Sequence, residues 1–350
     1  MHSYQIDLDG RNLHFRIMGE GPALLLFHAS PSSSAMMIPL MNELAQHFLV
    51  LAPDTPGYGQ STGLLEKPSG MRSYAKVMRR LTEELGLTRI GIYGTATGAQ
   101  LGIRYALDYP DQVSQLFLDN AAHFTEKQRE AILQAYFPDI SPKSDGSHLM
   151  TVWSIVRDLF TFFPWCFDKV QYRLPTGLPP ASVLHKVAVD YLVAGTDYHL
   201  AYRAAFQHEK AAFVQDLSCP TTIFNWTGSI VQPYIQQLIQ QGLPQHVSVQ
   251  DVATSNRIGM MAKHILEKWG TGEQAGNVDL GQCEGASPPA ALAMDLPTLE
   301  VDSHGGHLMK AWFFLRDQQA QAREAPDGLR LIHAEELQRQ LVRWLQTVDF

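Results

Sequence analysis

Short apolar runs alternate with amphipathic stretches through the first 122 residues. The apolar runs consist mainly of aliphatic and β-branched side chains, which is typical of strands buried on both faces. The predicted buried strands are residues 23–27, 48–52, 90–93 and 113–119, after an opening hairpin of residues 4–8 and 13–18. The predicted helices between them are residues 35–46, 71–85 and 98–109. Because strands that alternate with helices form parallel sheets, the pattern predicts an α/β fold with a doubly wound, mostly parallel sheet.

The alternation stops after residue 122 and returns near residue 221. Residues 123–215 are rich in aromatic side chains and helical in spacing, without a run of buried-strand type. The remaining predicted elements are strands at 221–226, 247–252 and 299–301 and helices at 231–240 and 257–269. We therefore expect a core of residues 1–122 and 216–350, with residues 123–215 inserted as a helical unit.

One junction between a predicted strand and helix has an unusual turn sequence. Residues 89–100 read RIGIYGTATGAQ, so Gly94 and Gly98 flank Ala96. Glycines at this spacing let a strand turn sharply into a helix, and Gly-x-nucleophile-x-Gly is the frame of a nucleophile elbow. The central position here carries a methyl group, which cannot attack a substrate. The sequence thus predicts a pocket at this turn without a covalent nucleophile.

Composition and charge exclude several classes of protein. Hydrophobic residues make up 45% and charged residues 18% of the 350, as in folded globular proteins. The formal net charge of −8 argues against nucleic-acid and anionic-membrane partners. No apolar stretch reaches the roughly 18 residues that cross a bilayer, and the first residues show no secretory signal. With three cysteines far apart in the sequence, these features predict a reduced, cytoplasmic location.

The expected partner is a small-molecule substrate. The sequence has neither a phosphate-binding glycine loop nor clustered metal-ligand spacing, so we expect no cofactor and no metal. Residues 227–295 are ambiguous and leave three alternatives open. They complete the sheet, cover it, or form an oligomer contact such as that of a homodimer.

Four motifs are spread along the chain: HASPSSS at residues 28–34, DTPGYGQS at 54–61, GTATG at 94–98, and a late Gly-His pair at 306–307. In this order they resemble the α/β-hydrolase fold family. HASPSSS is similar to the oxyanion segment of that family, with Ala29 where glycine is usual. DTPGYGQS is similar to its Asp-x-Pro-Gly-x-Gly-x-Ser segment. The resemblance implies an α/β-hydrolase fold in which residues 123–215 form a helical cap after the sixth strand.

The resemblance also implies roles for the residues around the elbow. Ala96 takes the nucleophile position, as either a natural loss or an inactivating substitution. The main-chain N–H groups of Thr97 and of Ser30 or Ala29 correspond to the oxyanion hole, which stabilises negative charge on a substrate oxygen. Since main-chain donors do not depend on the side chain at position 96, we expect the hole to be present.

A general base and an orienting acid complete the implied site. His307 matches the family's base after the last strand, and His304 is its local competitor. The family's usual acid position falls near Gly228, where the sequence has no carboxylate. The end of the sixth strand is an alternative position, and there we predict Asp119, with Asp302 as the fallback.

Three further residues are expected to bind substrate: His28 after the third strand, and His148 and Trp153 in the cap. Each has a structural alternative, because buried histidines and aromatic stripes belong more often to cores. The resemblance implies a hydrolase-like enzyme that cleaves an ester, lactone, thioester or carbon–carbon bond in a small or medium apolar molecule. Two alternatives stay open. They are an acid–base enzyme, such as a lyase or isomerase, and a ligand-binding protein without catalysis.

Overall fold

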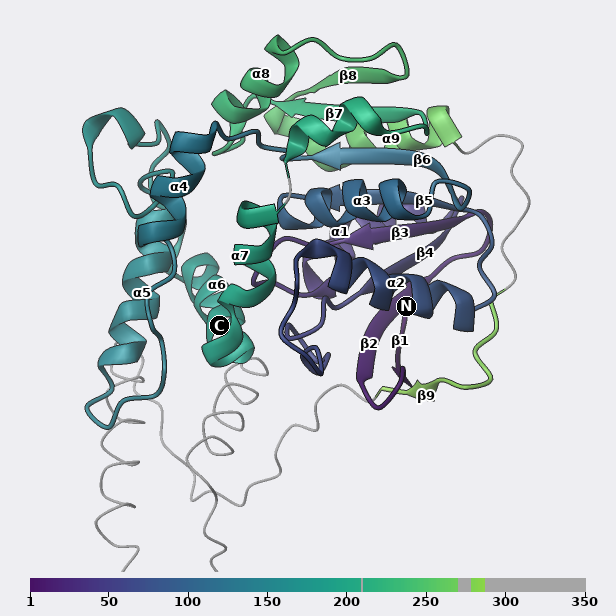
Figure 1. Ribbon diagram of the computed structural model, residues 1–350, viewed down its shortest axis with the longest axis horizontal. Coiled ribbons are helices and arrows are strands. Elements are labelled where there is room, and N and C mark those ends of the chain that lie inside the picture. The colour runs from purple at the N-terminus through teal and green to yellow at the C-terminus, as the bar shows by residue number, and fades with distance from the viewer. Residues whose placement is uncertain (209, 270–277, 287–350) are drawn as a thin grey trace, which may run out of the picture.

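A computed structural model describes residues 1–208, 210–269 and 278–286 of the chain. Within these residues the strands form one nine-stranded sheet in the order β8-β7-β6-β5-β3-β4-β2-β1-β9 (Figure 1). The strands are β1 His2–Asp7, β2 Asn12–Met18, β3 Ala23–Phe27, β4 Leu49–Pro53, β5 Ile90–Thr95, β6 Val113–Asp119, β7 Thr221–Trp226, β8 Val247–Val252 and β9 Glu284–Gly285. The α-helices are α1 Ile38–Leu44, α2 Met71–Glu84, α3 Thr97–Asp108, α4 Glu126–Ala135, α5 Ser147–Leu159, α6 Ala181–Ala194, α7 His199–His208, α8 Gln232–Gln240 and α9 Arg257–Trp269.

The sheet confirms the predicted α/β class. β3, β4, β5, β6, β7 and β8 pair in parallel, whereas β1 and β2 form the antiparallel hairpin expected at the N-terminus. The helix predicted at 35–46 is split into a 3₁₀ turn, Ser34–Met37, and α1. Pro39 stands in the first turn of α1, where its missing N–H cannot continue a helix from the preceding residues.

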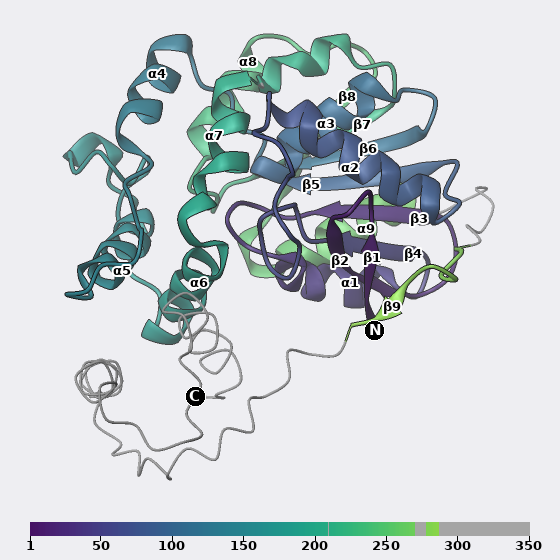
Figure 2. The same ribbon diagram turned by 60° about the horizontal axis from the view of Figure 1, so that its bottom comes forward.

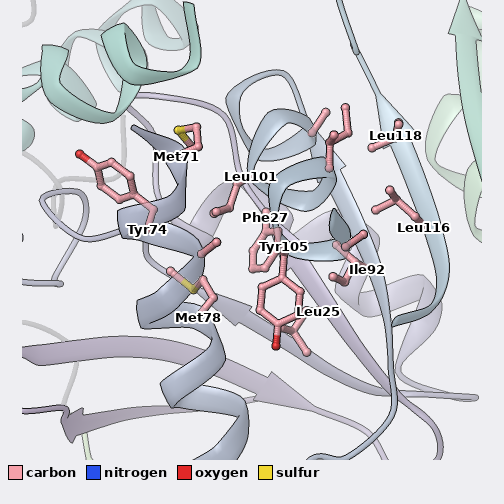
Figure 3. Packing of buried hydrophobic residues seen from close by; sticks show 14 of the residues in the cluster. Leu25, Phe27, Met71, Tyr74, Met78, Ile92, Leu101, Tyr105, Leu116 and Leu118 are labelled. Carbon is pink, nitrogen blue, oxygen red and sulfur yellow. The ribbon is translucent and has the colours of Figure 1, made fainter. Parts of the chain in front are cut away.

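Helices cover both faces of the sheet, which explains why its central strands are apolar without interruption. From β3, Leu25 and Phe27 enter the core beneath α2 and α3, while Leu24 and Leu26 enter the core beneath α1 and α9. Figure 3 shows the first of these cores, with side chains of α2 and α3 directed at those of β3, β5 and β6. Each fully buried aliphatic side chain of this kind contributes roughly 1.5–3 kcal/mol.

The helices α4, α5, α6 and α7 form a separate group beyond the carboxyl ends of the parallel strands (Figures 1 and 2). They have small cores of their own, one of which includes Val156, Leu184 and Tyr191. None of the helices in the described ranges is long and apolar enough to cross a membrane. The loops that follow β3, β5, β6 and β7 face this helical group, so a ligand site is expected between them.

Much of the ambiguous segment 227–295 completes the sheet. α8 packs on the face of α2 and α3, β8 extends the sheet beside β7, and α9 packs on the opposite face. The strand predicted at 299–301 lies outside the described residues.

Candidate functional site

The turn between β5 and α3 has the geometry of an elbow. Ala96 adopts φ 52° and ψ −112°, a conformation with positive φ that residues with a Cβ atom rarely adopt. A Cβ atom at Gly94 would lie 2.2 Å from the carbonyl oxygen of Gly98, and one at Gly98 would lie 2.1 Å from that of Phe27. Both glycines are therefore required for the close approach of β3, β5 and the first turn of α3.

The predicted oxyanion residues lie on the same cavity wall as Ala96. Thr97 begins α3, where the first N–H groups have no intrahelical partner and the helix dipole favours negative charge. Ser30 belongs to the loop after β3, and both residues line the cavity. Their assignment as oxyanion donors stays a prediction.

The cavity lies between the carboxyl ends of the parallel strands and the α4–α7 helices. Its volume is about 1600 Å³, larger than the roughly 300–1,000 Å³ of most drug-sized ligand sites. The aromatic side chains that line it are Phe124, Trp153, Phe160, Phe163, Tyr191, Tyr202, Phe206 and Trp226. Apolar residues outnumber polar ones in the lining, and among the polar residues Gln100 stands out because its Oε1 is buried without a hydrogen-bond partner in the described part of the chain. A largely apolar molecule with a small number of polar groups fits this lining.

Asp119 is fully buried at the end of β6 and is held by groups from neighbouring strands. The hydroxyl of Tyr93 donates to its Oδ2 at 2.9 Å, and that of Thr95 donates to the same oxygen at 3.0 Å. Arg257 forms an ion pair with it, and the Arg257 guanidinium lies 4.3 Å from the centre of the Trp226 ring. Burial and the Asp119 charge raise the pKa of Tyr93, so its hydroxyl remains a donor.

Arg257 is the first residue of α9, after the edge strand β8 and a short 3₁₀ turn. The predicted base, His307, lies outside the described residues, as do its competitor His304 and the fallback acid Asp302. The loop after β7 contains Gly228, so it brings no carboxylate to the usual acid position. In the described part of the chain, the group beside the elbow is therefore the Arg257 guanidinium, which forms an ion pair with Asp119.

The three residues expected to bind substrate separate into two groups. Trp153 lines the cavity, whereas His28 and His148 are absent from its lining. The Nε2 atom of His28 accepts a hydrogen bond from the N–H of Thr55 at 2.9 Å, and its Nδ1 donates to the next carbonyl at 2.9 Å. Burial lowers the pKa of His28, which keeps the ring neutral. His148 likewise accepts from a main-chain N–H through Nδ1 at 3.1 Å. Both histidines therefore make loop-supporting hydrogen bonds, and a contact of either with substrate stays a prediction.

Asp54, from the DTPGYGQS motif, is a fixed structural charge. Its carboxylate accepts hydrogen bonds from the N–H groups of Ser34 at 2.6 Å and Gln60 at 2.8 Å, and from Nδ1 of His14 at 2.8 Å. Burial acts to raise the pKa of Asp54, but hydrogen bonding and charge from His14 outweigh it and lower the value to about 2. This network fixes the loop after β4 against the loop after β3.

Sequence reasoning missed Asp190, a cavity residue on α6. Its Oδ2 accepts a hydrogen bond from the hydroxyl of Ser32 at 2.9 Å. Burial raises the pKa of Asp190 to about 6, with the nearby charge of Asp54 acting in the same direction and the Ser32 hydroxyl opposing it. The only local signal is a single acid in the otherwise apolar run VAVDYLVA, which does not indicate what the acid contacts.

No metal site is found among the described residues, where no group of three or more His, Cys, Asp or Glu side chains could hold an ion.

Comparisons with known proteins agree with this architecture. Residues 22–141 match the family model described as the alpha/beta hydrolase fold. An uncharacterized protein of Mycobacterium tuberculosis is 36% identical over 115 residues, which cover 32% of this chain and 33% of that protein. A fluoroacetate dehalogenase of Burkholderia is 25% identical over 256 residues, covering 67% of this chain and 80% of the dehalogenase. The solved enol-lactonase of Burkholderia xenovorans LB400 matches with a TM-score of 0.55 at 17% identity, covering 75% of this chain and 98% of the lactonase.

These matches agree with the observed order of the strands and with the geometry of the elbow. The match to the mycobacterial relative spans about a third of that protein's length. The family model covers the part of the chain that includes the elbow. The chain therefore has the α/β-hydrolase fold that its motifs predicted.

Proposed function

We propose that this chain is an enzyme that acts on a small or medium-sized, largely apolar molecule with a carbonyl group, without a covalent bond to position 96. One observation carries the proposal. The elbow keeps its strained geometry and stands beside the loop of Ser30, yet the residue at its centre is Ala96. A fluoroacetate dehalogenase and an enol-lactonase among the similar proteins support a carbonyl-containing substrate.

Within the described residues, the covalent route lacks more than the nucleophile. A serine at position 96 would need a base that accepts its proton, and Arg257, the side chain ion-paired with Asp119 beside the elbow, is a hydrogen-bond donor without an acceptor site. Arg257 is also neutralised by Asp119, so it serves as a fixed donor rather than a proton shuttle. We therefore favour acid–base chemistry on the same fold, the alternative that the sequence left open beside ester-type hydrolysis.

The remaining parts of the site suit a substrate carbonyl. Its oxygen would accept from the main-chain N–H groups of Thr97, at the start of α3, and of Ser30, in the loop after β3, where developing negative charge is stabilised. The methyl group of Ala96 leaves space directly beside that oxygen. We propose that the α4–α7 helices act as a cap, with Trp153 and Phe160 among the side chains that exclude water from the bound molecule.

Two measurements test ligand binding and the covalent route. Binding of the neutral apolar dye N-phenyl-1-naphthylamine should be weakened by Ala205→Trp, which adds a large side chain to the cavity lining, and retained in Val183→Trp, which changes an exposed residue of α6 outside the lining. Intact-mass spectrometry after treatment with a fluorophosphonate, which labels activated serines, should show no adduct. An adduct on the unmodified protein would refute the non-covalent route.

Turnover is tested separately by following aryl ketones, esters and lactones with the protein by nuclear magnetic resonance in D₂O. We expect exchange of protons next to the carbonyl group in at least one ketone, and no burst of acid release from esters. Dye binding without exchange or turnover of any compound would favour the alternative of a ligand-binding protein without catalysis.

A further inference from the structure

The cavity contains a carboxyl group to which the non-covalent route has so far given no role. We propose that Asp190 is the general base of this cavity and removes a proton from the carbon next to the carbonyl group of a bound, largely apolar molecule. The substrate class would then be carbon acids, such as ketones that form enolates. This inference rests on the proposed function and adds to it the group that moves the proton.

Asp190 reaches across the cavity from the helices to the strand loops. It belongs to α6, and its Oδ2 accepts from the Ser32 hydroxyl at 2.9 Å. Ser32 lies two residues after Ser30 in the loop that follows β3, and both line the cavity with Ala96. The carboxylate is therefore held beside the loop that contains Ser30. The group that removes the proton and a donor that stabilises the resulting oxygen charge would then face the same bound molecule.

Asp190 also differs from the other acids of this region in its partners. Of the described residues, Asp54 and Asp190 are the acids that line the cavity, and Asp54 is held by main-chain N–H groups and His14. Asp119, just behind the wall, is paired with Arg257. In the described part of the chain, Asp190 has a single hydroxyl donor and no ion pair.

Cations contribute to the cavity wall from several elements without neutralising Asp190. They are Arg16, Arg129, Lys186, Lys210 and Arg257, and none forms an ion pair with it among the described residues. The anion that faces Asp190 is Asp54, whose charge disfavours ionisation of its neighbour. On α6, Tyr191 is the adjacent ionisable group, and His185, whose pKa is lowered by burial, also lines the cavity. The carboxyl group is thus free to exchange a proton with a ligand.

Burial acts in the direction that this role requires. It raises the pKa of Asp190 to about 6, so the group is ionised at neutral pH and is a stronger base than an exposed aspartate. Perturbed carboxyl groups in cavities are candidates for acid–base chemistry for this reason.

The proton transfer balances without a further reactant. Asp190 takes the proton from the α-carbon, and the C–H electron pair forms a C=C bond as the carbonyl π pair moves to oxygen. The N–H groups of Thr97 and Ser30 stabilise that oxygen. Asp190 then returns the proton to another atom of the same molecule, the enolate electron pair forms the new bond to hydrogen, and the carboxylate is regenerated.

The proposal can be tested with 5-nitrobenzisoxazole, an apolar carbon acid with a coloured product. Removal of its ring C–H proton breaks the N–O bond and forms a nitrile and a phenolate, so the absorbance reports base strength in the cavity. We expect the protein to exceed acetate at equal concentration, with a rate that rises with pH to a plateau and an apparent pKa near 6. Asp190→Asn should lower the rate by roughly 100-fold or more, and Asp190→Glu should retain the pH-dependent rise.

Matched controls distinguish loss of the Asp190 base from loss of binding in the cavity. Asp197→Asn changes an exposed acid outside the cavity lining and should leave the rate unchanged. Displacement of N-phenyl-1-naphthylamine by 5-nitrobenzisoxazole, measured in the unmodified protein and in Asp190→Asn, reports binding alone. If 5-nitrobenzisoxazole displaces the dye from both proteins and both remove its proton at the same rate, the role of Asp190 is overturned and the proposed function stands. No displacement from either protein would overturn both.

Discussion

Replacing Asp190 with asparagine should stabilise the protein, and by an amount that depends on pH. The variant removes a charge that burial disfavours, and it keeps an oxygen that can accept the hydrogen bond from Ser32. The folded state raises the pKa of this carboxyl from its ordinary value of 3.8 to about 6. The folded state therefore binds the proton more tightly than the unfolded chain, and ionisation of Asp190 lowers stability as pH rises from about 4 through 6.

The size of the effect is set by the difference between the two pKa values. The two pKa values differ by about 2.2. At about 1.36 kcal/mol per pKa unit, ionisation of Asp190 lowers the free energy of unfolding by roughly 3 kcal/mol above pH 7. At about pH 5 the carboxyl group is mostly protonated in the folded state and mostly ionised in the unfolded state. The same linkage then lowers the free energy of unfolding by about 1.6 kcal/mol. The gain from Asp190→Asn should therefore be about twice as large at about pH 8 as at about pH 5.

Urea unfolding followed by tryptophan fluorescence at the two pH values measures this gain. Asp197→Asn is the matched control, since it changes an exposed acid of the same helical group and should give no comparable gain at either pH. Equal or lower stability of Asp190→Asn at the higher pH would refute the reasoning, because it would mean that the buried carboxylate is compensated by a donor or cation.

Substitutions at Arg257, Asp54 and Ala96 test other parts of the site by urea unfolding. Arg257→Ala leaves Asp119 buried without its cation and should cost roughly 3–5 kcal/mol, whereas Arg257→Lys should cost less. Asp54→Asn should cost up to about 2.4 kcal/mol at about pH 7, because the pKa of Asp54 lies near 2 instead of 3.8, and the cost should shrink as pH falls from about 4 towards 2. Ala96→Gly should stabilise the elbow by about 1 kcal/mol because it relieves a positive φ. Ala99→Gly, inside α3, should cost about 1 kcal/mol or more, and similar losses in both would contradict the strain argument.

The parts of the fold that sequence predicted best are those with a strong local pattern. The sequence predicts β3, β6, β7 and β8 at their observed bounds, and the first three are buried along nearly their whole length and bordered by turn residues. β8 was harder to recognise because it is an edge strand with exposed residues at its centre, so its apolar positions are few. The helix at 35–46 was predicted too long because the pattern ignored Pro39.

The site shows the same division between local and distant information. The elbow and the oxyanion segment are each a short run of consecutive residues. Short motifs such as GTATG therefore indicate the geometry of each run. Asp190 meets Ser32 across 158 positions of sequence, and Arg257 meets Asp119 across 138. No local pattern specifies either partner. The hydrogen bond between His28 and Thr55 is also beyond a local pattern, since an imidazole at a strand end can bind either a loop or a ligand.

The three acids around the cavity, Asp54, Asp119 and Asp190, differ in their hydrogen-bond partners, and this difference gives them different roles. Asp54 and Asp119 have charged or multiple donors that hold them in fixed positions, so they stabilise loops and strand ends. Asp190 has one neutral donor and an apolar setting, which makes its proton the most exchangeable of the three. Because Ala96 removes the covalent route from the elbow, the reactive group of the proposed enzyme lies on the helical wall that faces it. The elbow then keeps only its geometric task, which is to present main-chain donors to a ligand oxygen.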